Sequence, residues 1–296
     1  MRFSKLRLLR AIFTYFARCP ALTRRRWGRI LGWLAPRLLR SRAHIVRTNL
    51  ALSFPDVPEQ TREEQLRQHF YLLAQSVVDR GLMWFGEPAA ILEAVEINGL
   101  EHIDRLLEQG QRIMMLAPHF IALDAAGTRI SMHLKRVASF YTHQSDPDFD
   151  TIIHDGRSRF NEVHLVSRSE GIRGLIRYLR SGMPIYYLPD MDFGREGAVF
   201  VPFFGVKAAT LTATAQIARS SKAAVVPVIS RLDAQTGRYH VDILPPLENF
   251  PGEMSMLHAT AHLSRLIETW VKRDPPQYYW VHRRFKTRPP GEDKFY

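Results

Sequence analysis

The spacing of apolar residues changes at about residue 111, and this change constrains the fold of the chain more than any other feature. Beyond it, short apolar runs alternate with stretches in which apolar residues recur at helical spacing. The short runs predict strands at RIMMLA (112–117), VASFY (137–141), VHLV (163–166), PIYYLP (184–189), AVVPVI (224–229) and YHVDIL (239–244). The longer stretches predict helices at about 122–133, 148–160, 169–181, 210–220 and 257–272. This alternation predicts an α/β fold with a mostly parallel central sheet flanked by helices.

One long helix is predicted before this region, at residues 61–86. Leu66, Phe70 and Leu73 follow one another near helical spacing. Thr61 and Glu64 form a capping-box pattern that would begin the helix.

The chain has a formal net charge of +12. The distribution of that charge along the chain decides which kind of partner it indicates. Residues 1–50 contain 13 of the 41 Lys and Arg residues and no acid. Residues 51–296 contain the other 28 Lys and Arg residues and all 29 acids. The body is therefore close to neutral. A neutral body argues against a nucleic acid partner, although aromatic residues interleave the basic cluster near the C-terminus, as they do in single-strand binders.

The basic N-terminal segment is also apolar. One side of its helical wheel carries Phe3, Leu6, Leu9, Ile12, Phe13 and Phe16, and WGRILGWLAPRLL (27–39) adds two tryptophans. Basic amphipathic helices with aromatic residues suit an anionic membrane surface, and no acid in the segment could pair its charges. The alternative is a helix packed on the body with solvated arginines. We expect a membrane-associating helical segment at 1–45 and a second domain at 46–296.

A regular spanning helix and secretion are not predicted, but a short or tilted insertion around residues 8–17 stays open. No stretch reaches the roughly 18 uncharged apolar residues of a spanning helix, and Arg10 interrupts what could be a signal sequence. Cys19 is the only cysteine, which excludes intrachain disulfides and cysteine-based zinc sites. These features predict the cytoplasmic face of a membrane, towards which basic residues are biased.

Ligands of such sheets bind outside the carboxyl ends of the strands, and two places fit this rule. His119 follows one predicted strand, and Asp124 stands five residues later. The spacing itself carries little information, because His143 and Asp148 share it. Spacing alone favours a strand-end histidine with Asp124 as a charge at a helix start. The two side chains can meet only if His119 precedes the helix, since five helical residues rotate a side chain by roughly 140°.

Asp190 and Asp192 follow another predicted strand at the same edge. Alternate acids can bind a metal, orient a basic group or cap a turn, and capping is the common role of Asp before Gly. Arg157, Arg159 and the basic run 281–289 could bind phosphate or carboxylate, although solvation is the ordinary interpretation of any one of them. The spacing of the acids predicts no metal site.

Several motifs are missing from the sequence. There is no GxSxG elbow, Walker A loop, GxGxxG or HExxH. DMDFG is not accompanied by the other protein-kinase motifs. These absences argue against nucleophile-elbow hydrolases, P-loop enzymes and Rossmann dehydrogenases.

Taken together, five segments resemble one family, the late acyltransferases of lipid A biosynthesis (lauroyl and myristoyl transferases of Gram-negative inner membranes). The segments are NLALSFP (49–55), APHFIALD (117–124), YLPDMDFGREGAVFVPFFGVKAAT (187–210), VVPVI (225–229) and WVHRRFKTRPPGE (280–292). The resemblance runs from about residue 46 to the end. It implies the wider glycerolipid-acyltransferase fold, in which His-x4-Asp/Glu is the catalytic pair.

The resemblance also implies a membrane-associated O-acyltransferase of lipopolysaccharide biosynthesis at the cytoplasmic face of the bacterial inner membrane. Its donor would be an acyl carrier protein thioester and its acceptor a hydroxyl of a Kdo-bearing lipid A precursor, without cofactor or metal. Anionic inner-membrane lipid would be a further partner. His119 would be the general base and Asp124 its orienting carboxylate. Family members often have Glu at the position of Asp124, or Gln at that of Met191.

A thiolate is a good leaving group, so direct transfer without a covalent acyl-enzyme is expected. Backbone amides at the start of the 122–133 helix are candidate oxyanion donors. The side-chain candidates for the oxyanion or the acceptor phosphates are Arg157, Arg159, Asp190, Asp192, Arg283, Arg284 and Lys286. The acyl-pocket candidates are Phe120, Phe203 and Phe204.

Two other functions stay open. One is acyl transfer to a different lipid, such as a glycerophospholipid or an ornithine lipid. The other is a non-catalytic membrane adaptor that binds anionic lipid through its arginines. The adaptor predicts that His119→Ala leaves function intact, whereas removal of residues 1–40 abolishes it.

Overall fold

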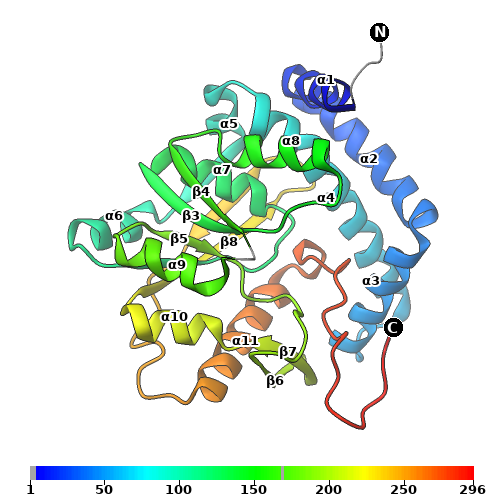
Figure 1. Ribbon diagram of the computed structural model, residues 1–296. Helices are drawn as coiled ribbons and strands as arrows, with labels where there is room; N and C mark the ends of the chain where they lie inside the picture. The colour runs from blue at the N-terminus through cyan, green and yellow to red at the C-terminus, as the bar shows by residue number, and fades with distance from the viewer. Residues whose placement is uncertain (1–4, 168–169) are drawn as a thin grey trace.

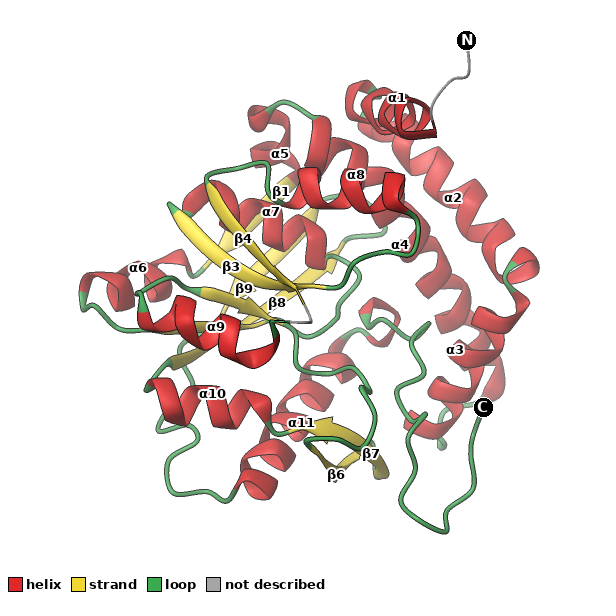
Figure 2. Cartoon of the chain, viewed as in Figure 1, coloured by secondary structure: helices red, strands yellow, loops and turns green. Residues whose placement is uncertain are grey.

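A computed structural model describes residues 5–167 and 170–296 of the chain (Figures 1 and 2). The strands are β1 Val95–Asn98, β2 Ile113–Leu116, β3 Arg136–Tyr141, β4 Glu162–Ser167, β5 Ile185–Tyr187, β6 Ala198–Phe203, β7 Val206–Leu211, β8 Ala224–Leu232 and β9 Tyr239–Ile243. The helices are α1 Lys5–Arg18, α2 Ala21–Leu38, α3 Arg40–Ser53, α4 Glu59–Phe85, α5 Pro88–Ala94, α6 Leu100–Glu108, α7 Leu123–His133, α8 Pro147–Arg157, α9 Gly171–Arg180, α10 Ala213–Ser221, α11 Met256–Arg273 and the 3-10 helix η1 Pro275–Gln277.

Seven strands form the central sheet in the order β1-β9-β8-β2-β5-β3-β4. Every neighbouring pair is parallel except β8 with β9, which confirms the predicted mostly parallel sheet. β2 lies beside β5, with Met115 opposite Tyr186. Because the two strands run in the same direction, the segments that follow them leave the sheet at one edge.

Both faces of the sheet are buried, which explains why its inner strands read as continuous apolar runs. In β2, Ile113 and Met115 join one apolar cluster, whereas Met114 and Leu116 join the other. The first cluster includes the apolar side of α7, and the second includes those of α9, α10 and α11. These helices lie on opposite sides of the sheet in Figure 2.

Several elements were not predicted from the sequence. β1, α5 and α6 are short and half exposed, so their apolar residues are too few to form a clear periodic pattern. β6 and β7 pair as a separate antiparallel hairpin, where the sequence showed only an apolar run. The predicted helix at 169–181 begins at a residue outside the described ranges, and α9 starts at Gly171.

The predicted capping box at Thr61 and Glu64 is wrong. α4 begins two residues earlier, at Glu59, after Pro58, and no side chain caps it. Pro58 has a fixed φ and an extended conformation, which brings the chain into the helix without a hydroxyl cap.

The helices α1 and α2 pack along α4 and continue into α3 as an arm at the side of the body (Figure 1). Gly28 and Gly32 allow close contact between α2 and α4, because a Cβ atom at these positions would lie 2.2 Å from Gln75 Oε1 and 2.6 Å from Tyr71 Cα. Residue 45, the predicted end of the membrane-associating segment, lies within α3. The division into 1–45 and 46–296 stays a prediction.

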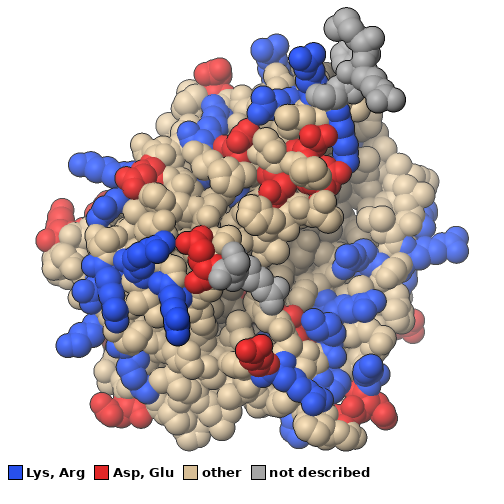
Figure 3. All heavy atoms as spheres, in the orientation of Figure 1, with Lys and Arg blue, Asp and Glu red and all other residues tan. Residues whose placement is uncertain are grey.

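The sequence argument that no acid pairs the N-terminal charges is wrong for part of the segment. Acids of the body form ion pairs with three of its basic residues, namely Lys5 with Asp146, Arg10 with Asp155 and Arg24 with Asp79, and Arg47 just beyond the segment pairs with Glu63. Figure 3 shows the acids of α8 beside α1. Within the described ranges, no helix is both long and apolar enough to cross a bilayer.

A buried network joins α2 to the body. Arg24 Nε lies 2.7 Å from Asp79 Oδ1, and the same guanidinium donates to the carbonyl of Cys19. Gln75 and Tyr239 donate to the second oxygen of Asp79. Burial raises the pKa of Asp79, while Arg24 and the hydrogen bonds oppose that rise. The network therefore depends on the presence of both charges.

Replacing Asp79 by alanine is expected to lower the free energy of unfolding by about 3–5 kcal/mol, because Arg24 would be left buried without its counter-charge. Urea unfolding followed by circular dichroism measures the change. The matched control is the double variant Asp79→Leu with Arg24→Met, in which no charge is stranded and the loss should be much smaller. A change below about 1 kcal/mol for Asp79→Ala would show that the pair is not needed.

Candidate active site

The first component of the site is the loop between β2 and α7. Leu116 ends the buried strand, and α7 begins at Leu123, so His119 precedes the helix, as the sequence argument requires. The amide of Ala117 still donates to the carbonyl of Tyr187 at 2.9 Å, which extends the β2–β5 ladder by one step. His119 therefore leaves the sheet directly beside the segment that follows β5.

Asp190 holds His119 through both its ring and its backbone. His119 Nδ1 lies 2.7 Å from Asp190 Oδ1, and the His119 backbone amide donates to Oδ2 at 2.9 Å. Burial would raise the pKa of Asp190, but the His119 charge and these hydrogen bonds hold that pKa below its usual value. An ionised carboxylate only accepts hydrogen bonds, so Nδ1 carries a proton in the charged ring and keeps it when the ring is neutral. The Nε2 lone pair then has no partner in the described part of the chain.

Asp124 lies in the first turn of α7, but its partners are arginines. It accepts from Arg80 Nε at 3.0 Å and from Arg157 Nε at 2.8 Å. Burial would raise the pKa of Asp124, but Arg157 and Arg80 hold it below its usual value. No hydrogen bond or ion pair joins Asp124 to His119 within residues 5–167 and 170–296. The expected direct contact is replaced by the His119–Asp190 contact, because the adjacent strand brings Asp190 to Nδ1.

The C-terminal segment fixes the His119 loop from the other side. The amide of Tyr279 donates to the carbonyl of His119 at 2.9 Å, and that of Ile121 donates to the carbonyl of Gln277 at 2.7 Å. Asn49 of α3 is fully buried, and its side chain donates to the carbonyls of Trp280 and His282. Sequence reasoning missed Asn49, whose only signal was its position in the NLALSFP segment.

Asp192 ties the loop after β5 to the C-terminal segment, and its predicted role in binding the acceptor stays a prediction. Its oxygens accept from the amide and hydroxyl of Thr287, both at 2.7 Å, and from the amide of Gly194. Its own backbone amide donates to Nε2 of His282 at 2.9 Å. Thr287 and His282 flank the basic run, so these bonds hold that run against the loop.

The predicted basic residues near the C-terminus differ in their surroundings. Arg284 is buried and donates to Ala209 and Thr210, which commits its terminal nitrogens to β7. The side chain of Lys286 reaches Asp192, and the exposed Arg283 lies over the ring of Tyr296. Arg284 also lines the cavity that contains His119, and its role as an oxyanion or phosphate ligand stays a prediction.

The two remaining predicted arginines lie on the α7–α8 side of the site. Arg157 is held by Asp124, as described above, and its side chain is one-third exposed. Arg159 donates to the carbonyl of Gly86 at 2.6 Å and lies over the ring of Phe160. Arg157 is therefore coupled to the His119 loop through the first turn of α7, whereas Arg159 is tied to the end of α4.

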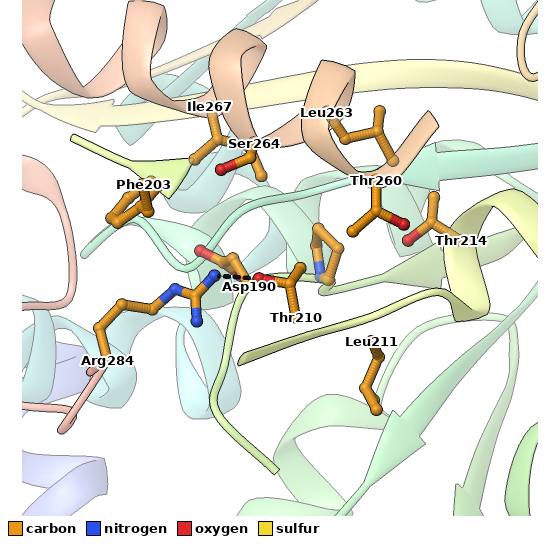
Figure 4. A pocket seen from close by; sticks show the side chains of 11 residues that line it. Asp190, Phe203, Thr210, Leu211, Thr214, Thr260, Leu263, Ser264, Ile267 and Arg284 are labelled. Atoms are coloured by element: carbon orange, nitrogen blue, oxygen red, sulfur yellow. Dashed lines mark hydrogen bonds between the residues drawn. The ribbon is translucent and has the colours of Figure 1, made fainter. Parts of the chain in front are cut away.

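Two small cavities meet at Asp190. The first is lined by His119, Asp190, Met191, Tyr278, Tyr279, Trp280, His282 and Arg284. The second, shown in Figure 4, is lined by Asp190, Arg284 and apolar and hydroxyl side chains from β6, β7, α10 and α11, among them Phe203. Phe120 is buried against Tyr278, and Phe204 packs against Phe54 and Trp280. Of the three predicted acyl-pocket residues, Phe203 thus lines a cavity beside Asp190.

The geometry around His119 can support proton abstraction. An ionised, buried carboxylate fixes one ring nitrogen and leaves the other without a partner among the described residues, so that it can act as a base. His119 lines the first of the two cavities, which we call the cleft. The sequence identified both His119 and Asp190, and it placed them at the same edge of the sheet. It did not pair them, because the number of residues between two strands says nothing about which strands are neighbours.

The chain is similar to known proteins along most of its length. The family model for bacterial lipid A biosynthesis acyltransferases matches residues 6–287. The lipid A biosynthesis lauroyltransferase of Escherichia coli K12 is 34% identical over 267 residues, which cover 90% of this chain and 86% of that protein. The palmitoleoyltransferase of the same strain is 32% identical over 91% of this chain and 87% of its own length. The myristoyltransferase is 31% identical, over 88% and 80% respectively.

The family match spans α1 to the basic run that closes the site, so it includes every residue that holds His119. The chain belongs to the bacterial lipid A biosynthesis acyltransferase family, and it is an acyltransferase of lipid A biosynthesis.

Proposed function

We propose that the protein transfers a fatty acyl chain from an acyl carrier protein thioester to a hydroxyl of a Kdo-bearing lipid A precursor. His119 is the general base in this proposal, and Asp190 orients its ring. The observation that carries the proposal is the His119–Asp190 contact of 2.7 Å, which leaves the lone pair of His119 Nε2 available at the cleft.

The proposed reaction is a direct transfer. Nε2 of His119 accepts the proton of the acceptor hydroxyl while the hydroxyl oxygen attacks the thioester carbonyl. The tetrahedral intermediate then collapses, the carbon–sulfur bond breaks, and the leaving thiolate takes the proton from His119. The products are an ester and the free thiol of the carrier.

The lining of the cleft supports a path without an acyl-enzyme. No serine, threonine, cysteine or lysine is among the described residues that line the cleft with His119. Cys19 is buried at the end of α1, and its carbonyl binds Arg24. Asp124 has a different role in this proposal: it holds Arg157 at the edge of the site, where the guanidinium could stabilise the oxyanion or bind an acceptor phosphate.

The proposal is tested with purified protein, acyl carrier protein loaded with chains of different length, and a Kdo-bearing lipid A precursor. Mass spectrometry should detect an acceptor that has gained one acyl group. A glycerophospholipid and a precursor without Kdo serve as alternative acceptors, and acyl-coenzyme A as the alternative donor. Transfer to the glycerophospholipid but not to the lipid A precursor would overturn the assigned acceptor. Efficient use of acyl-coenzyme A alone would overturn the assigned donor.

We propose a location at the cytoplasmic face of the membrane, and the outward side of α2 supports the membrane contact that this location needs. Leu22, Ile30 and Trp33 are exposed on the side of α2 opposite Gly28 and Gly32, which face α4. Trp33 is 60% exposed, which is unusual for such a large apolar side chain. The exposed Arg26 and Arg29 of the same helix complement an anionic lipid surface.

Replacing Leu22 and Trp33 by serine is expected to weaken binding to phosphatidylglycerol vesicles by at least about tenfold, because each apolar side chain contributes roughly 1.5–3 kcal/mol when fully buried. Vesicle flotation measures the change. Leu257→Ser on α11 removes an equally exposed leucine far along the chain and serves as the control. Equal flotation of both variants and the wild type would contradict a membrane contact through α2.

A further inference from the structure

A second histidine, His282, lines the same cleft as His119. Its main chain is fixed by three hydrogen bonds. Its amide donates to the carbonyl of Tyr279, and its carbonyl accepts from the Asn49 side chain at 2.8 Å and from the amide of Arg284 at 2.9 Å. Its ring Nε2 lies 2.9 Å from the backbone amide nitrogen of Asp192. The position of the ring is therefore set from both ends.

The contact with Asp192 determines which nitrogen of His282 carries a proton. A backbone N–H group can only donate, so Nε2 must accept and must be unprotonated. The ring is therefore neutral, with its single proton on Nδ1. Burial, together with the nearby positive charges of His119 and Arg284, lowers the pKa of His282 to about 4, in agreement with a neutral ring.

The two histidines of the cleft therefore differ in the ring nitrogen that is left without a partner among the described residues: one has a free lone pair, and the other has a free N–H group. His119 uses its Nδ1 proton on Asp190 and has a free lone pair on Nε2. His282 uses its Nε2 lone pair on Asp192 and has a proton on Nδ1, for which the described residues provide no acceptor. One ring can thus take a proton, and the other can donate a hydrogen bond, within one cleft.

We infer that His282 donates a hydrogen bond from Nδ1 to the thioester carbonyl oxygen as that oxygen becomes negative during attack. This inference rests on the proposed acyl transfer. The contact stabilises the tetrahedral intermediate, and the Nδ1 proton stays on His282 throughout. A neutral donor suits this role, because it does not add a second positive charge beside the His119 that becomes protonated in the same step.

Two substitutions separate the donor from the structural contact. In His282→Gln, the amide oxygen can still accept from Asp192, but no donor stands at the position of Nδ1. In His282→Asn, the amide nitrogen stands close to the position of Nδ1, but the acceptor for Asp192 is lost. We expect His282→Gln to lower kcat by about 10²–10³-fold, as removal of one oxyanion donor does, with little change in KM. His282→Asn should keep a higher kcat than His282→Gln.

The opposite order, in which Gln retains the wild-type kcat and Asn does not, would show that His282 only holds the Asp192 loop. Nitrogen-15 NMR of the histidine rings in the wild-type protein gives a measurement that does not depend on activity. We expect an unprotonated Nε2 and a protonated Nδ1 for His282 at pH 7, and a protonated Nε2 would overturn the inference. Failure of acyl transfer itself is recognised separately, because the wild type would then show no transfer to the lipid A precursor.

Discussion

Replacement of His119 by alanine is expected to lower kcat for acyl transfer by about 10³-fold, within the range that a positioned general base contributes. The physical reason is that a hydroxyl is a weak nucleophile until its proton is removed during attack. KM for the acceptor should change much less, because the imidazole acts mainly in the transition state. Initial rates with saturating thioester donor and varied acceptor measure both constants.

The matched control for this experiment is His143→Ala. His143 has the same five-residue spacing to an aspartate, Asp148, yet its side chain is 66% exposed and its ring contacts Asp150 instead. Its removal should leave kcat unchanged. If His119→Ala transferred acyl groups as fast as the wild type, His119 would not be the base of the reaction.

Asp190→Asn is expected to reduce kcat by roughly 10³–10⁴-fold, because it places the His119 proton on the wrong nitrogen. In the wild type, Asp190 accepts hydrogen bonds from two N–H groups of His119, one in the ring and one in the backbone. An asparagine side chain has one acceptor oxygen. The backbone amide of His119 can only donate, so it takes this oxygen as its acceptor. The amide NH₂ then faces Nδ1 and makes it an acceptor, so the proton moves to Nε2, where the base is needed.

Asp124→Asn is the comparison that distinguishes the two carboxylates. It should also reduce activity, because Arg80 and Arg157 would lose their counter-charge. However, it should leave the His119 tautomer unchanged. Nitrogen-15 NMR of the His119 ring in both variants provides the measurement. A tautomer change in Asp124→Asn, without one in Asp190→Asn, would restore the sequence-based pair as the working dyad.

The sequence was sufficient for the parts of the fold that depend on local patterns. Strands such as β2 and β8 are buried on both faces, so they appear as apolar runs that need no partner to be recognised. The hairpin β6–β7 and the short strand β1 were missed, because their burial arises from α11 and β9, which are distant in sequence. Pairing of the N-terminal basic residues with acids of α4 and α8 was hidden for the same reason.

For the site, the sequence by itself determined that His119, Asp124 and Asp190 stand where strands end, and through its motifs it determined the family. Only the tertiary structure decided which carboxylate holds the histidine. Asp124 is five residues from His119 in the chain but turns with α7 towards Arg80 and Arg157. Asp190 is 71 residues away, yet β5 lies directly beside β2. The order of strands in a sheet arises from long-range pairing, and no spacing in the sequence records it.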